Sequence, residues 1–117
     1  MRALGLGIAT ALLLAAAVAA QPPPSVEGIW DLTWQTRRGP RQSGSIVLIR
    51  RGAVLEGELR GKGSVHARGS VSGSGFVLRG RRMLVPYTIE GNVRGDRMEG
   101  SISMLSVNRR FTGIRRP

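Results

Sequence analysis

The amino-acid sequence predicts an all-β fold, a small eight-stranded antiparallel up-and-down (meander) barrel that follows an N-terminal signal helix. From Gly28 onward, apolar and polar residues alternate with a period of two, and no stretch has helical spacing of apolar residues over three turns. The connections between the alternating segments have roughly two to seven residues, whereas a parallel crossover needs a dozen or more. A glycine also recurs in the middle of several segments, which favours a tightly coiled, closed sheet.

The first twenty residues have the layout of a secretory signal peptide. Arg2 gives a short positive region, residues 3–17 are uncharged and mostly apolar, and small residues lead to Ala20. An uncleaved membrane anchor is the alternative, because the run approaches the ~18–20 residues that span a bilayer. Its many alanines are weak membrane residues, so we predict cleavage near Ala20, no transmembrane span afterwards, and export to the periplasm or the medium. A Pro-rich spacer over 21–27, containing Pro22–Pro24, is then expected to lead into the barrel.

The barrel domain is predicted over residues 28–115. Eight strands are expected near 28–35, 43–50, 54–61, 65–72, 75–80, 83–93, 97–105 and 108–115. Alternation assigns an apolar face to five of them: Trp30, Leu32 and Trp34; Leu55, Gly57, Leu59 and Gly61; Val65, Ala67, Gly69 and Val71; Tyr87, Ile89, Gly91 and Val93; and Phe111 with Gly113. The opposite faces carry mostly charged and small polar residues, so each strand has one buried and one wet face.

A weak internal repeat favours closure of the sheet. It comprises 56–61, 68–73, 90–95 and, less completely, 99–102, and each copy places its first glycine on the apolar face. A glycine in a strand interior costs stability unless the geometry uses it. Here we expect the glycines to leave space for large rings such as Trp30, Trp34 and Phe111. Closure would also remove exposed strand edges from a protein without disulfides.

Several segments resemble a known group of barrels. Gly28-Ile29-Trp30 opens the first strand, 87–100 reads Tyr-Thr-Ile-Glu-Gly-Asn-Val-Arg-Gly-Asp-Arg-Met-Glu-Gly, and 110–115 reads Arg-Phe-Thr-Gly-Ile-Arg. Together they resemble the calycin-like barrels, the lipocalin and avidin group, and more closely small secreted bacterial barrels of that type. The resemblance implies that Trp30 closes one end of the barrel and that a last-strand arginine, Arg115 or Arg110, packs over it. It also implies a small-ligand carrier, although the chain lacks the long loops of a typical lipocalin.

The composition argues against catalysis and against metal binding. The 117 residues include one His and no Cys. The sequence therefore excludes disulfides and a lipidated cysteine and contains no zinc-binding motif, and no acidic cluster indicates a calcium loop. His66 is expected on a wet face without a catalytic partner, and Glu56 and Glu58 beside Arg60 form an exposed charged stripe. Arg94-Gly95-Asp96 is foremost a hairpin turn rather than an adhesion motif. We therefore expect no enzyme activity, no cofactor and no metal.

Arginine is the most informative residue type. There are 18 Lys+Arg against 7 Asp+Glu, and all but Lys62 of the basic residues are Arg, five times as doublets. One interpretation is a coding bias that exchanges Lys for Arg. The alternative is functional, because guanidinium groups bind phosphate, sulfate and carboxylate bidentately. In a meander, alternate hairpins meet at one end, and the candidate anion-binding residues gather there: Arg37, Arg38, Arg41, Lys62, Arg81, Arg82, Arg109 and Arg110.

These features lead to three hypotheses of function. The first is a non-catalytic exported monomer, a binding or envelope-associated module that contacts an anionic envelope component through its arginine-rich rim. The second is a small-ligand carrier, whose interior is either filled by Trp30, Trp34, Leu55, Leu59, Tyr87 and Phe111 or left partly hollow. The third is an inhibitor that binds a partner protein through residues 21–25. Nucleic acid is disfavoured, because aromatic residues make up only 4% and none alternates with the arginines.

Overall fold

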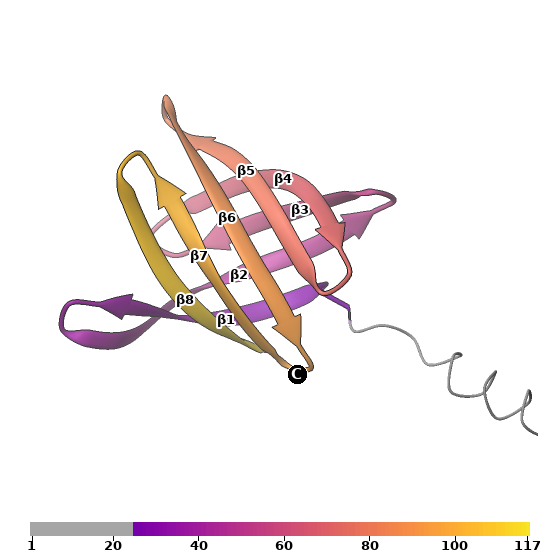
Figure 1. The fold of residues 1–117 in the computed structure, drawn as a ribbon, viewed down its shortest axis with the longest axis horizontal. Coiled ribbons are helices and arrows are strands. Elements are labelled where there is room, and N and C mark those ends of the chain that lie inside the picture. The colour runs from indigo at the N-terminus through magenta and orange to yellow at the C-terminus, as the bar shows by residue number, and fades with distance from the viewer. Residues whose placement is uncertain (1–24) are drawn as a thin grey trace, which may run out of the picture.

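The computed structural model describes residues 25–117, which form eight antiparallel strands closed into one barrel (Figure 1). The strands are β1 (Gly28–Thr36), β2 (Gly39–Arg51), β3 (Val54–Arg60), β4 (Ser64–Ser72), β5 (Gly75–Arg82), β6 (Val85–Arg94), β7 (Arg97–Met104) and β8 (Val107–Arg115). The predicted all-β meander barrel is confirmed. The predicted signal peptide over 1–20 and residues 21–24 of the spacer lie outside the described residues. Between residues 25 and 117, no helix is long and apolar enough to cross a membrane.

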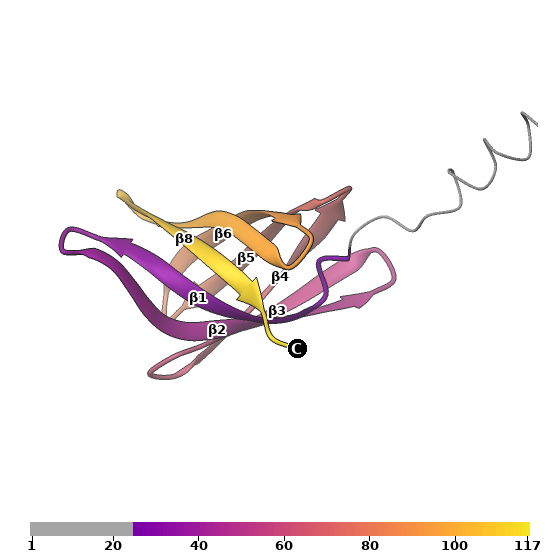
Figure 2. The same ribbon diagram turned by 90° about the horizontal axis from the view of Figure 1, so that it is seen from below.

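The barrel closes because β1 pairs with β8 as well as with β2. Trp30 lies opposite Arg115 and Trp34 opposite Phe111 in this pairing, and the two strands run side by side in Figure 2. Each strand therefore has a neighbour on both sides. The turns after β1, β3, β5 and β7 lie at one end, which we call the open end; the other turns and the C-terminus lie at the closed end (Figure 1).

The first hairpin is longer than the sequence suggests. β2 begins at Gly39 rather than near residue 43, so that β1 and β2 are joined by only two residues, Arg37 and Arg38. Pro40 does not interrupt the strand, because it pairs with Gln35 of β1 and lies beyond the last β2–β3 pair, Ser45 with Arg60. A proline is tolerated at such a free edge, since no third strand needs its missing N–H group. The hairpin consequently projects past its neighbour at the open end.

A second correction concerns the turn between β5 and β6. The alternation placed Met83 and Leu84 at the start of a strand, yet β5 continues to Arg82 and β6 begins at Val85. Met83 and Leu84 form the turn itself, and Met83 has a φ of 59°. Their apolar character concealed the turn, because turns with positive φ usually carry glycine or asparagine.

A β-bulge in β2 changes which residues face the interior. The pairing with β1 shifts between Asp31 and Thr33, where Ser45 and Gln42 are the respective partners, so β2 holds one extra residue there. Gly44 lies within the bulge and has a φ of 78°. Because the extra residue reverses the alternation, Ile46 faces inward on one side of the bulge and Arg41, opposite Trp34, faces inward on the other.

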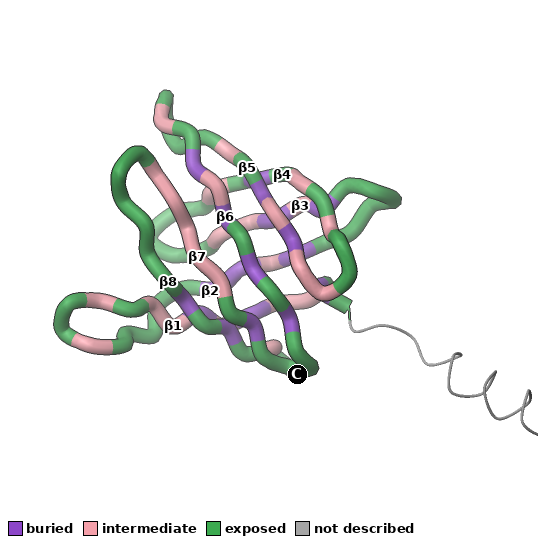
Figure 3. Tube along the Cα trace, viewed as in Figure 1, coloured by how far each residue is buried: buried purple, intermediate pink, exposed green. Residues whose placement is uncertain are grey.

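The core fills the closed half of the barrel, where buried residues concentrate in Figure 3. Three inward glycines make room for rings: a Cβ at Gly80 would lie 2.5 Å from the Tyr87 hydroxyl, one at Gly91 2.6 Å from Phe76, and one at Gly100 2.7 Å from Phe111. The expected relation therefore holds for Phe111. Neither Trp34 nor Trp30 is the ring nearest to any of these three glycines; the Trp30 indole lies near the Cβ position of Gly28 instead. The remaining core consists of Val26, Leu32, Ile46, Leu48, Leu55, Ala67, Leu78, Ile89, Val93 and Met98.

Trp30 and Arg115 cover the closed end. The guanidinium carbon of Arg115 lies 4.3 Å from the centre of the fully buried Trp30 ring. Arg115 also donates to the backbone carbonyls of Ser25, at 2.6 Å, and Glu27, while the Trp30 indole donates to the Val26 carbonyl at 3.1 Å. Val26 is itself buried, so residues 25–27, which the sequence placed in the spacer, pack onto the barrel.

Candidate binding site at the open end of the barrel

The open end contains a pocket of about 670 Å³. One part of its lining is apolar: Trp34 from β1, Ile102 and Met104 from β7, Leu105 from the following turn, and Val107 from β8. Trp34 is held by a hydrogen bond of 2.8 Å from its indole nitrogen to the Ser43 carbonyl and by contact with Phe111 beneath it. The hollow therefore begins where the packed core ends.

The other part of the lining is basic. Arg41, Lys62, Arg82 and Arg109 reach the pocket from β2, the β3–β4 turn, β5 and β8 respectively. Strand alternation explains two of them, since Arg82 lies two residues from the inward Gly80 and Arg109 two residues from the buried Phe111. The bulge at Gly44 turns Arg41 inward. Three arginines thus occupy inner-face positions in the half of the barrel that the core leaves open.

A smaller pocket of about 220 Å³ adjoins the first and shares four of its residues, Trp34, Ser43, Lys62 and Arg82. Its inner wall adds Leu59 and Val65. The sequence placed Trp30, Trp34, Leu55, Leu59, Tyr87 and Phe111 in the barrel interior. Trp34 and Leu59 are only partly buried and line the pockets, while the other four are buried. The interior is therefore packed toward the closed end and partly hollow toward the open end, where Tyr87 is nevertheless buried opposite Met104.

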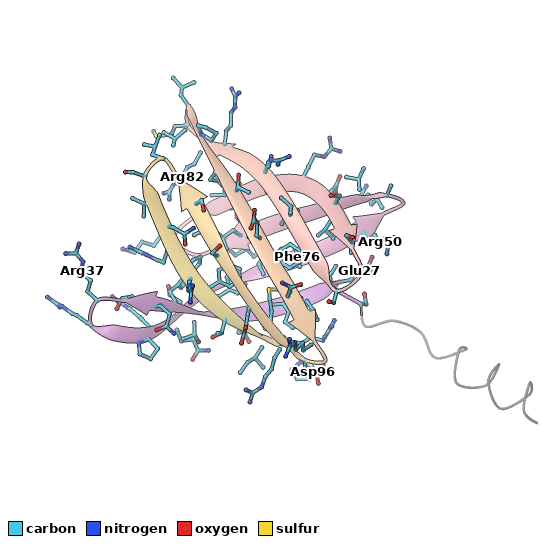
Figure 4. The ribbon with its side chains drawn as sticks, viewed as in Figure 1. Glu27, Arg37, Arg50, Phe76, Arg82 and Asp96 are labelled. Carbon is cyan, nitrogen blue, oxygen red and sulfur yellow. The ribbon has the colours of Figure 1, made fainter. Side chains whose placement is uncertain are left out.

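The eight candidate cations are not all in this pocket. Arg37 and Arg38 form the tip of the β1–β2 hairpin and border a second hollow, which shares Thr36 and Arg41 with the pocket. Arg37 points away from the barrel in Figure 4, whereas Glu27, Arg50 and Asp96 lie toward the other end. Arg81 and Arg110 alternate with the inward Arg82 and Arg109, so they belong to the outer face. Arg41, Lys62, Arg82 and Arg109 are brought together in the pocket, and the other four lie outside it, at the hairpin tip and on the outer face.

The eight candidate cations have no counter-charge within bonding distance in the described part of the chain. Among residues 25–117 none of them forms an ion pair, and neither do Arg50, Arg79, Arg94 and Arg97, whereas five other arginines do: Arg51, Arg60, Arg68, Arg115 and Arg116. Hydrogen bonds from Arg60 and Arg116 lower the pKa values of Glu58 and Asp31 below their ordinary values. Asp31, Glu56, Glu58 and Asp96 are thus engaged along the wall and at the closed end, and no carboxylate lies in the four connections of the open end.

The other groups considered from the sequence lie away from the pocket. His66 is exposed, with its Nδ1 3.9 Å from a Glu58 oxygen, and Glu56 pairs with Arg51 and Arg68. Gly95 and Asp96 form the β6–β7 turn, and Asp96 pairs with Arg115. In the part of the chain that the structure describes, no three metal-ligating side chains gather at one place. Ser25, part of the segment assigned to the inhibitor hypothesis, is bound to Arg115.

Two features of the site escaped sequence reasoning. The inward direction of Arg82 and Arg109 follows from their spacing to Gly80 and Phe111, so the alternation contained this signal. The inward direction of Arg41 depends on the bulge, which no residue pattern marked.

Comparison with protein-family models gives no match, and a search of curated proteins finds no similar sequence.

Proposed function

We propose that this protein is a non-catalytic binding module whose open end holds a small amphiphilic anion, with an anionic head group and an apolar tail. The observation that carries the proposal is one pocket lined by four cations without protein counter-charges and by five large apolar side chains. A surface that binds anions and an interior that carries ligands were separate hypotheses from the sequence. The pocket joins them, because cations and large apolar side chains line the same hollow at the open end of the barrel.

The head group would bind to Arg41, Lys62, Arg82 and Arg109. Guanidinium groups present planar pairs of N–H donors that match two oxygens of a carboxylate, sulfate or phosphate. Since these four cations share no ion pair within residues 25–117, an anion would relieve their mutual repulsion without breaking an existing contact. This arrangement favours an anionic over a neutral or cationic ligand.

The tail would pack against Trp34, Ile102, Met104 and Val107. A volume of about 670 Å³ is within the range of ~300–1,000 Å³ for small-molecule sites. A flexible methionine adapts to irregular apolar shapes, and a rigid indole provides a large contact area. The hydroxyl-bearing residues in the lining, Thr36 and Ser43, have no imidazole or carboxylate beside them among the lining residues, which supports binding rather than hydrolysis.

The setting of this activity is part of the proposal. We propose a monomer, exported to the periplasm or the medium after cleavage near Ala20, where anionic envelope components are available as ligands. The calycin-like resemblance is likewise proposed, with support from the Trp30–Arg115 contact and the order of the strands. The resemblance implies that a ligand is carried inside the barrel. In this protein the pocket at the open end would provide the space for it.

Binding can be measured by titrating the purified protein with dodecyl phosphate below its micelle concentration and following Trp34 fluorescence. Inorganic phosphate tests the head alone, and dodecyl maltoside tests the tail alone. We expect dodecyl phosphate to bind more tightly than either, and added salt to weaken its binding because contacts between exposed charges are screened. Equal binding of dodecyl maltoside, or binding that is insensitive to salt, would contradict the proposal.

A matched pair of double variants tests the role of the cations. Arg41→Gln/Arg109→Gln removes two charges from the pocket, and Arg94→Gln/Arg97→Gln removes two from a cross-strand pair at the closed end. Because a hydrogen bond to a charged group contributes ~1.5–3 kcal/mol, we expect at least about tenfold weaker binding for the pocket variant. The control variant should bind as the wild type does. If both double variants bound dodecyl phosphate equally weakly, the loss would be an effect of net charge and not of the pocket cations.

A further inference from the structure

The turns at the open end carry exposed apolar side chains. Met83 and Leu84, which form the β5–β6 turn, are 94% and 89% exposed, and Leu105 in the β7–β8 turn is 81% exposed. At the closed end the corresponding turns consist of Gly52 and Ala53, Gly73 and Ser74, and Gly95 and Asp96. Large apolar turn residues are thus confined to one end of the barrel.

Two of these residues have a backbone conformation that is unfavourable for any residue with a Cβ. Met83 has a φ of 59° and Leu105 a φ of 53°, in the left-handed region where a Cβ is unfavourable. Glycine or asparagine would satisfy both turns at lower conformational cost and with less apolar exposure. Since neither residue contributes a buried side chain to the core, the fold itself does not require methionine or leucine there.

Met83, Leu84 and Leu105, which we call the apolar tips, lie close in sequence or on neighbouring strands to cations that form no ion pair within residues 25–117. Arg81 and Arg82 directly precede Met83, Arg109 and Arg110 follow Leu105 on β8, and Arg37 and Arg38 form the tip of the neighbouring hairpin. Arg82 and Leu105 line the same pocket, so the β5–β6 and β7–β8 turns flank its mouth. Figure 1 shows both turns at the open end. Apolar tips surrounded by arginines match the layering of a lipid surface, with acyl chains beneath phosphate head groups.

We propose that the open end docks on an anionic lipid bilayer, with Met83, Leu84 and Leu105 inserted between the head groups and the surrounding arginines bound to lipid phosphates. A second copy of the chain is a poorer occupant, because two open ends would bring their unpaired cations together. An anionic bilayer neutralises those charges and covers the apolar tips in one contact. Docking is an interaction beyond ligand binding in the pocket, and it does not depend on that binding.

The test uses the purified protein and sedimented vesicles of two compositions, phosphatidylcholine alone and equal parts of phosphatidylcholine and phosphatidylglycerol. We expect association with the anionic vesicles and little with the neutral ones. In Met83→Asn/Leu84→Ser, binding to the anionic vesicles should fall at least tenfold. Neither residue lines the pocket, and asparagine tolerates the left-handed backbone, so the variant should fold as the wild type does. Ile114→Thr removes an exposed apolar side chain at the closed end and should leave binding unchanged.

A second variant pair separates the charges, and a second readout separates docking from pocket binding. Arg81→Gln/Arg110→Gln should weaken vesicle binding more than Arg94→Gln/Arg97→Gln does. Met83→Asn/Leu84→Ser should still bind dodecyl phosphate, so that failure of docking and failure of the pocket are distinguishable. Wild-type vesicle binding by Met83→Asn/Leu84→Ser would overturn the proposal. The proposal would also be overturned if the wild type formed a stable dimer and Met83→Asn/Leu84→Ser were a monomer. In that case a second copy of the chain would cover the apolar tips.

Discussion

The rings of Trp34 and Phe111 lie with their centres 5.3 Å apart and their planes tilted by 57°. Phe111 is buried in the core, whereas Trp34 is partly buried and lines the pocket. The pair therefore marks the boundary between the filled and the hollow half of the barrel. Because the Trp34 indole also donates to the Ser43 carbonyl, the pocket wall is held in place before any ligand arrives.

Replacing Trp34 with phenylalanine should silence the fluorescence response to dodecyl phosphate. The remaining indole, Trp30, is fully buried beneath Arg115 at the closed end and does not line the pocket. Loss of the hydrogen bond to Ser43 should lower the free energy of unfolding by about 1 kcal/mol. Fluorescence titration and urea denaturation measure the two effects. An undiminished fluorescence response in Trp34→Phe would place the ligand near Trp30 instead.

Gly44→Ala should destabilise the barrel through the bulge that turns Arg41 inward. A Cβ at this position would collide with the backbone carbonyl of Arg60, and the φ of 78° is unfavourable for alanine. We expect a loss of about 1–3 kcal/mol in the free energy of unfolding, measured by urea denaturation. Gly39→Ala is the matched control, since Gly39 also has a positive φ, 102°, but open space around its Cβ position. Equal losses in both variants would mean that the contact with β3 is unimportant.

The fold and the site differ in how far the sequence could predict them. Alternation and short connections were sufficient for eight strands in a closed meander, because each buried face needs a period of two. Met83 and Leu84 show where this signal fails: apolar turn residues have the pattern of a strand. Arg41 shows a second limit, because a one-residue bulge reverses the inner and outer faces without any marker in composition. The pocket depends on the second feature, because Arg41 lines it only by virtue of the bulge, so this part of the lining became visible only in the assembled barrel.

Arg115→Lys should weaken the closed end. The Arg115 guanidinium lies over Trp30 and donates to the carbonyls of Ser25 and Glu27, and a lysine ammonium can neither stack on the ring nor reach all of these acceptors. We expect the free energy of unfolding to fall by about 1–3 kcal/mol, as measured by urea denaturation. Arg110→Lys, the other last-strand arginine considered from the sequence, should have little effect because its side chain forms no ion pair within residues 25–117. The opposite order would assign the covering role to Arg110.

Tyr87 should make the stability of the barrel sensitive to alkaline pH. The side chain is buried, its hydroxyl donates to the His66 carbonyl at 2.9 Å, and burial raises its pKa above the ordinary value of 10.0. Because the folded state disfavours the phenolate, this stabilising contribution is fully present below pH 10.0 and is lost as the pH rises through the folded-state pKa.

Tyr87→Phe is the variant that isolates this effect. It should be less stable than the wild type by about 1 kcal/mol at neutral pH, because it lacks the hydrogen bond. Its stability should then decline less as the pH rises, since phenylalanine has no proton to lose, so the two curves converge. Urea denaturation over a pH series measures this, and tyrosinate absorbance gives the pKa directly because the chain has one tyrosine. Parallel stability curves for the two proteins, or a tyrosine that titrates at its ordinary pKa, would show that burial of Tyr87 does not cause the loss of stability at alkaline pH.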